Sequence, residues 1–78
     1  MIKNYQDTLF DEIKLLAKFP QQSQLEGIKI HNDASPEIVN SAKSLFEKGL
    51  ISQPDGGYLT DSGLETVDHL HHVLATLS

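Results

Sequence analysis

The order of elements in the second half of the chain follows from one stretch, residues 45–63. Residues 45–51 (Leu-Phe-Glu-Lys-Gly-Leu-Ile) indicate the end of an amphipathic helix that stops at Gly49 and continues as an apolar strand. Residues 52–58 contain Pro-Asp-Gly-Gly, which is typical of a hairpin turn whose glycines adopt positive φ. Thr60 then stands where an N-cap begins a last helix. The stretch therefore predicts a helix, a two-stranded hairpin and a second helix, in that order.

The first segment, residues 5–19, has the apolar spacing of an amphipathic helix. Phe10 and Ala17 widen its stripe. Pro20 is expected to end the helix, because the residue before a proline avoids the helical region. The stripe itself recurs at steps of three and four and begins before the segment: Ile2, Tyr5, Leu9, Ile13 and Leu16.

The segment from residue 21 to residue 32 is compatible with two structures. Ile28 and Ile30 alternate with polar residues, as they do in a short strand. Leu25 and Ile28, three residues apart, instead suit a short helix capped by Ser23. We favour the helix, fraying into extended chain at its C-terminal end.

A third amphipathic helix is predicted to begin at Pro36, with Asp33 or Ser35 as its cap. Its apolar stripe consists of Ile38, Val39, Ala42, Leu45 and Phe46. Phe46 is expected to be buried between this helix and the first one. The last helix has its own apolar stripe: Leu64, Val67, Leu70, Leu74 and Leu77.

Size and composition restrict the class of protein. A chain of 78 residues suffices for one domain, and we expect residues 1–78 to form a single, mainly α domain with a small β-hairpin. There is no cysteine, which excludes disulfides and thiolate metal sites and fits a cytoplasmic location. No run of the sequence is long and apolar enough to span a membrane, so no membrane partner is expected. The net charge is −5, and all 6 basic residues are lysines.

The residues around the two glycine-containing turns resemble the winged helix-turn-helix superfamily. The resemblance lies in residues 35–39 (Ser-Pro-Glu-Ile-Val), residues 46–51 (Phe-Glu-Lys-Gly-Leu-Ile) and residues 56–63 (Gly-Gly-Tyr-Leu-Thr-Asp-Ser-Gly). The whole chain also resembles a small family of uncharacterised bacterial proteins that are labelled DNA-binding by analogy. The resemblance implies a winged-helix fold in which the helix that begins at Pro36 contacts DNA and the hairpin is the wing.

The resemblance also implies a set of candidate DNA-contacting residues. Asn40, Lys43 and Ser44 match the base-reading positions, where the superfamily usually has Arg or Lys, and Asp55 stands in the wing where Arg is common. On duplex DNA, Lys43 and Lys48 are the residues expected to contact phosphates. The full candidate set is Ser35, Asn40, Lys43, Ser44, Lys48, Gly56 and Gly57.

Two functional hypotheses follow. The leading hypothesis is DNA binding, as a small transcriptional regulator or accessory factor. The alternative is a protein–protein interaction module on the same scaffold, which the acidic charge and the missing arginine favour because DNA affinity draws on cations placed against phosphates. The stripe of the last helix is then a candidate homodimer interface, with Leu70, Leu74 and Leu77 as its residues.

The sequence predicts neither an enzyme nor a metal site, and no cofactor is expected. No nucleophile lies in a recognisable elbow, and a chain of this size leaves little room for a sheltered pocket. His69, His71 and His72 share the last helix with Glu65 and Asp68. A tight metal site usually needs three converging protein ligands, and His71 points away from the other two histidines. We therefore interpret this group as ordinary helix surface.

Overall fold

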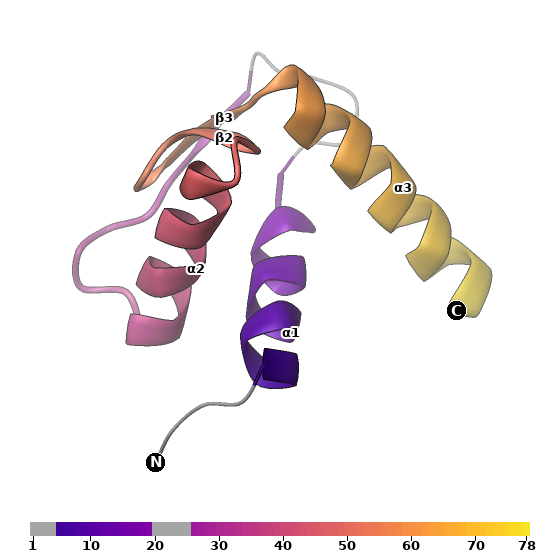
Figure 1. Cartoon of the computed structure of the whole chain (residues 1–78), viewed down its shortest axis with the longest axis horizontal. Coiled ribbons are helices and arrows are strands. Elements are labelled where there is room, and N and C mark those ends of the chain that lie inside the picture. Colours follow the sequence, from indigo (N-terminus) through magenta and orange to yellow (C-terminus); the bar gives the residue numbers. More distant parts are fainter. Residues whose placement is uncertain (1–4, 20–25) are drawn as a thin grey trace.

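The structure is a computed structural model that describes residues 5–19 and 26–78. These residues form three helices and a three-stranded antiparallel sheet, whose strands lie between the helices in the sequence (Figure 1). A mainly α chain with a small β-hairpin was predicted, and this coarse description is confirmed. The elements are α1 (Tyr5–Leu16), β1 (Ile28–Lys29), α2 (Pro36–Glu47), β2 (Ile51–Gln53), β3 (Gly56–Leu59) and α3 (Asp61–Leu77).

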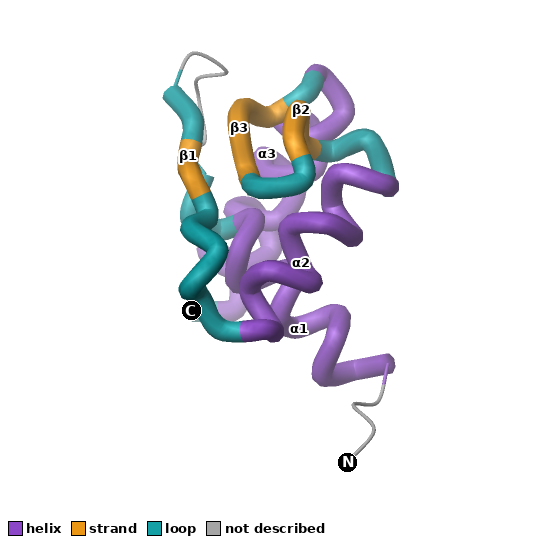
Figure 2. The backbone as a smooth tube through the Cα atoms, turned by 90° about the vertical axis from the view of Figure 1, so that its left-hand side faces the viewer, coloured by secondary structure: helices purple, strands orange, loops and turns teal. Residues whose placement is uncertain are grey.

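The sheet has the strand order β1-β3-β2, so β3 is central and the first strand in sequence pairs with the last (Figure 2). Ile28 lies opposite Gly57, and Lys29 lies opposite Gly56. The sequence predicted a two-stranded hairpin alone. In the structure the hairpin is instead the larger part of a three-stranded sheet. Its turn consists of Pro54 and Asp55 alone.

The prediction of a short helix in the segment before α2 is wrong for its described part, because residues 28–29 form a strand. Ser23 and Leu25, on which that prediction depended, lie outside the described residues. The extended conformation is favoured over a helix here because β1 lies very close to the glycines of β3. A Cβ on Gly27 would overlap the carbonyl oxygen of Gly57. Close backbone approach of this kind is a tertiary effect, which the spacing of apolar residues in the local sequence cannot predict.

Gly49, Gly56 and Gly57 all have positive φ, at 80°, 119° and 77°. The predicted stop of α2 at a left-handed glycine and the predicted positive φ in the hairpin are both confirmed. The environments of these glycines differ. A Cβ on Gly56 would overlap the carbonyl oxygen of Ile28, whereas a Cβ on Gly49 would meet no heavy atom within 4 Å among the described residues.

Thr60 joins the end of the hairpin to α3 and to the end of α2. Its Oγ1 accepts a hydrogen bond from the Gly63 amide at 3.0 Å, which confirms the predicted N-cap. The same hydroxyl donates to the Gly49 carbonyl at 2.6 Å. Gly63 permits this junction, because a Cβ there would overlap the carbonyl oxygen of Leu50. The short motif Leu-Thr followed by Gly thus has a packing reason.

The described helices and strands pack around one hydrophobic core, to which α1 contributes Leu15, Leu16 and Phe19. Two predictions about this core are wrong. Phe46 was expected to be buried between α2 and α1, but it is 41% exposed. In α1, only Leu16 of the predicted stripe is buried among the residues whose side chains are described, since Leu9 is exposed and Ile13 is half-buried. The complete core is Leu15, Leu16, Phe19, Ala42, Leu45, Ile51, Leu59 and Val67.

The first helix also ends earlier than predicted, at Leu16, and two turn hydrogen bonds carry the chain to Phe19. The Lys18 amide donates to Leu15 and the Phe19 amide donates to Leu16, at 3.1 Å each. These tighter bonds place Phe19 in the core beside Leu16.

Gly56→Ala and Gly49→Ala separate backbone strain from steric overlap. We expect Gly49→Ala to destabilise the fold by about 1 kcal/mol, because only the left-handed conformation is penalised. Gly56→Ala should destabilise it by roughly 2–4 kcal/mol, because the new methyl also displaces β1. Chemical denaturation of both variants measures the difference. Equal losses of stability would show that β1 is not held against Gly56.

Candidate functional site

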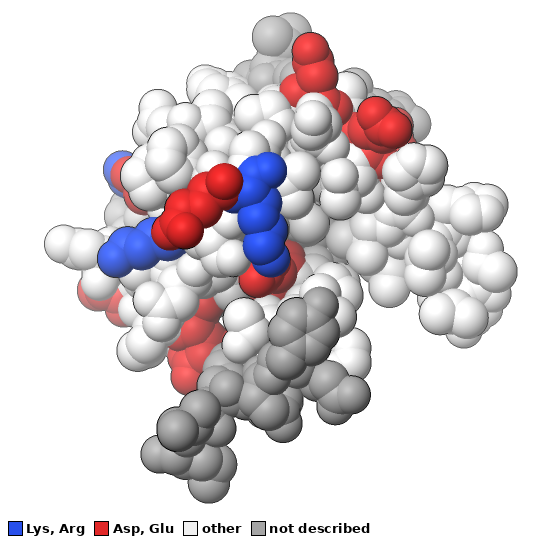
Figure 3. All heavy atoms as spheres, in the orientation of Figure 1, with Lys and Arg blue, Asp and Glu red and all other residues white. Residues whose placement is uncertain are grey.

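The outward face of α2 carries charges of both signs. Helical spacing places Asn40, Lys43 and Glu47 on one line, and all three are exposed. Lys43 makes no ion pair with any residue of the described ranges. Positive and negative side chains stand beside one another on this side of the molecule, with no broad positive area (Figure 3).

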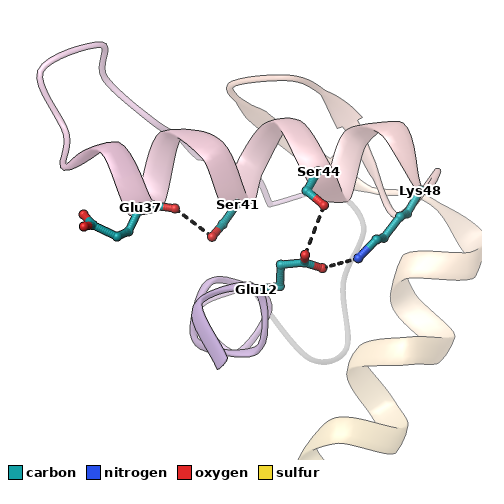
Figure 4. A network of polar contacts seen from close by, with 5 residues as sticks. All are labelled: Glu12, Glu37, Ser41, Ser44 and Lys48. Atoms are coloured by element: carbon teal, nitrogen blue, oxygen red, sulfur yellow. Dashed lines mark hydrogen bonds and ion pairs between the residues drawn. The ribbon is translucent and has the colours of Figure 1, made fainter. Parts of the chain in front are cut away.

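Ser44 and Lys48, two of the candidate DNA-contacting residues, are hydrogen-bonded to α1 (Figure 4). Ser44 Oγ donates to Glu12 Oε1 at 3.0 Å, and Lys48 Nζ donates to Glu12 Oε2 at 2.6 Å. Both oxygens of one carboxylate are thereby occupied. The geometry assigns these two side chains to the α1–α2 contact rather than to an outside ligand.

Glu12 is the residue that the sequence analysis missed. It is only 7% exposed, although acidic side chains are rarely buried unless they are paired. Its pairing is unequal, because the Lys48 side chain is 54% exposed and the Glu12 side chain is not. The signal was present in the sequence: Glu12, Leu15, Leu16 and Phe19 have the spacing of a helical stripe that contains one acid.

The hairpin turn is tied to the chain after β1. The Ile30 amide donates to the Asp55 carbonyl at 2.7 Å, and Lys29 Nζ bonds to Asp55 Oδ2. The hydrogen bond from Lys29 lowers the pKa of the Asp55 carboxyl below its ordinary value. Gly56 is buried and Gly57 is half-buried, so these two candidates serve the sheet, and the turn exposes Pro54 instead.

A groove of about 480 Å³ lies between the hairpin turn, α2 and the chain that follows β1. Lys43 lines it from α2, and the Lys29–Asp55 pair lines it from the sheet. Ser35, the residue before α2, is exposed and makes no side-chain cap hydrogen bond. Of the seven candidates for DNA contact, Ser35, Asn40 and Lys43 are the ones that the structure leaves exposed and outside the Glu12 contact and the sheet.

Large apolar side chains are exposed on both α1 and α3. On α1 these are Leu9 and Phe10, and we define the open apolar face as the three on α3: Val73, Leu74 and Leu77. Phe10 is 57% exposed and Leu77 is 79% exposed. Leu74 and Leu77 continue the same stripe of α3 that is buried at Val67 and half-buried at Leu70.

The helices α1 and α3 diverge (Figure 1). The N-terminal end of α1 and the C-terminal end of α3 lie at the same end of the molecule, while the core joins their other ends. Residues 69–78 include no Lys, Arg, Asp or Glu. The surface over this part of α3 is accordingly free of charged side chains on the side that Figure 3 shows. The three candidates for a dimer interface therefore differ in burial: Leu70 packs against the core, whereas Leu74 and Leu77 are exposed.

The histidines of α3 do not converge on one point. His69 Nε2 lies 3.9 Å from Glu65 Oε1, and both side chains are exposed. His71 Nε2 is buried and has no hydrogen-bond partner among the residues that the structure describes. No group of three or more potential metal ligands occurs within the described ranges.

Lys48→Met and Glu12→Gln test the unequal burial of this ion pair. We expect Lys48→Met to destabilise the fold by roughly 2–4 kcal/mol, because it leaves a buried carboxylate with Ser44 alone. Glu12→Gln should cost about 1 kcal/mol, since the amide still accepts from Ser44 and Lys48 turns to water. Urea denaturation measures both, with exposed Lys43→Met as the matched control, expected within about 0.5 kcal/mol of the parent protein. A larger loss for Glu12→Gln than for Lys48→Met would contradict this assignment.

None of the helices in residues 5–19 and 26–78 is both long and apolar enough to cross a membrane. No curated protein and no solved structure matches the chain. The model of a family of unknown function (DUF5669) matches residues 3–78, almost the whole sequence. The chain therefore belongs to this family of unknown function, DUF5669.

Proposed function

We propose that this chain is a protein–protein interaction module on a winged-helix-like scaffold, and that the open apolar face is its docking surface. The observation that carries the proposal is the apolar stripe of α3, which runs from the core at Val67 to Leu77, a side chain that is 79% exposed. Over its last turns this stripe packs against none of the core residues that the structure describes. Exposed apolar side chains that follow one another along a helix stripe are typical of interaction sites.

The winged-helix-like scaffold is supported by the sheet. The order β1-β3-β2, with α2 leading directly into the β2–β3 hairpin, fits the arrangement that the sequence resemblance implies. One part of a DNA-reading helix-turn-helix has no counterpart in this arrangement. The chain between β1 and α2 contains turns and no helix, so no positioning helix directly precedes α2.

The charges on α2 also favour a protein partner over DNA. Lys48 is neutralised by Glu12, and Lys29 is neutralised by Asp55. Lys43 is left with Glu47 beside it on the exposed line of α2. Phosphate contacts by several cations supply most of non-specific DNA affinity, and this surface offers few of them.

A photoreactive amino acid at position 77 tests the docking surface in the cells that make the protein. We expect one discrete adduct from position 77 and none from position 65, which is exposed on another side of α3. Leu74→Glu should abolish the adduct, because it places a charge in the apolar contact. Equal labelling from both positions, or an adduct that survives Leu74→Glu, would sink the proposal.

Duplex DNA binding remains the second candidate function, favoured by the exposed Asn40 and Lys43 beside the hairpin. For this candidate we expect a Kd of roughly 10⁻⁴–10⁻⁶ M for mixed-sequence duplex, tightening at low salt. Lys43→Gln should reduce the salt slope by about one unit, while Lys14→Gln on α1 should leave it unchanged. A fluorescence titration measures both. Absence of binding at tens of micromolar protein in low salt removes DNA from consideration.

A further inference from the structure

We infer that the groove between the hairpin turn, α2 and the chain after β1, here called the hairpin groove, binds a small organic monocarboxylate. The apolar body of the ligand lies against the apolar side chains of the groove, and its carboxylate binds Lys43. The hairpin groove has a volume of about 480 Å³. Small-molecule sites in proteins typically have volumes of roughly 300–1,000 Å³. This site goes beyond the proposed docking surface, which lies on α3 and shares no residue with it.

Three segments that are far apart in the sequence form the walls of the hairpin groove, and two of them are bonded to each other. The chain that follows β1 runs back along α2 before that helix begins (Figures 1 and 2). The Ile30 amide donates to the Asp55 carbonyl at 2.7 Å, which ties this chain to the hairpin turn. The ion pair of Lys29 with Asp55 joins the same two segments. Because these walls are already fixed, a ligand loses little affinity to ordering them.

The inner part of the hairpin groove is apolar. Ile30 and Val39 are half-buried there, and Ile30 also packs against the hydrophobic core. Pro54 adds an exposed apolar side chain from the hairpin turn, while exposed His31 and Asn32 supply N–H donors. Apolar walls with a few polar groups that orient the ligand are typical of small-molecule sites. A phosphodiester backbone has no apolar group to place against such walls, so they favour an organic molecule over DNA.

The charges of the hairpin groove match one negative charge. Lys29 is paired with Asp55, whereas Lys43 has no ion-pair partner within the described ranges. Glu47, one turn further along α2, does not line the groove. A single carboxylate on the ligand would therefore pair with Lys43, and a second negative charge would meet the carboxylate of Asp55.

The groove between α1 and α2 has a different balance of charge. Its volume is about 400 Å³, and Asp11 and Glu37 line it together with Lys14 and Lys18. Acids and lysines are equal in number there, so that groove offers no excess charge to an ion. The chain as a whole has a net charge of −5. The unpaired lysine beside apolar side chains is thus a local property of the hairpin groove.

Titration of the isotope-labelled full chain with phenylacetate, followed by two-dimensional NMR, tests the inference. We expect the amide signals of Ile30, Val39 and Lys43 to shift together and to saturate, while those of α3 stay in place. The neutral analogue phenylacetamide should bind at least about tenfold more weakly, because it lacks the charge. Inorganic phosphate should also bind at least about tenfold more weakly, because it lacks the apolar body.

Lys43→Met and Lys14→Met form a matched pair, since each replaces one exposed lysine with an unbranched neutral side chain. Lys14 does not line the hairpin groove. Lys43→Met should weaken phenylacetate binding at least about tenfold, and Lys14→Met should change its Kd by less than about twofold. Val39→Ala should weaken phenylacetate and phenylacetamide alike by about fivefold, because it removes apolar contact. The NMR spectrum of each variant also shows whether it is folded.

Several results would overturn the inference. Shifts that are scattered over the molecule, or that never saturate, would show that there is no such site. Equal affinity for phenylacetate and phenylacetamide, or an equal effect of the two lysine variants, would refute the role of Lys43. Phosphate that binds as tightly as phenylacetate would refute the role of the apolar side chains. Displacement of phenylacetate by a lower concentration of mixed-sequence duplex DNA would assign the groove to nucleic acid instead. The docking surface on α3 is tested separately, by the adduct from position 77.

Discussion

The buried carboxylate of Glu12 decides how the rest of the molecule is arranged. It accepts from Ser44 and Lys48, and so fixes one face of α1 against the C-terminal half of α2. That choice buries Leu15, Leu16 and Phe19 and leaves Leu9 and Phe10 on the outside. A buried ion pair contributes little net stability compared with apolar packing, but a misaligned α1 would leave the charge unpaired. Glu12 therefore acts mainly on specificity of packing, since only one rotation of α1 satisfies it.

The same interaction links the α1–α2 contact to function. Ser44 and Lys48 are polar residues on the helix that the sequence resemblance implies would contact DNA. Both side chains instead donate hydrogen bonds to Glu12. A lysine that neutralises a buried carboxylate is a poor phosphate ligand. If the lysine moved to a phosphate, the carboxylate would remain buried without its cation. The electrostatic character of α2 thus follows from an acid on another helix. It is a tertiary property, and the net charge of the chain does not reveal it.

Local chemistry was sufficient to predict the second half of the fold. Gly49, Thr60 and the two hairpin glycines each occupy positions where a single residue type satisfies a backbone requirement, and such requirements are visible without a structure. The first half was harder because α1 has two apolar stripes. Leu9, Ile13 and Leu16 have better periodicity, but the partner helix selects the stripe that contains Glu12. The strand β1 was also out of reach, since its pairing depends on the glycines of β3, far along the chain.

The apolar side chains that remain exposed on α1 and α3 are a consequence of this packing. A helix with one apolar stripe is finished once that stripe is packed, whereas α1 and α3 each retain apolar side chains after the core has formed. Figure 1 places α1 between α2 and α3, so the remnant on α3 lies away from α2. A partner bound to the exposed stripe of α3 would leave the outward face of α2 accessible. Docking on α3 and a role for α2 are therefore compatible, because they use different surfaces of the molecule.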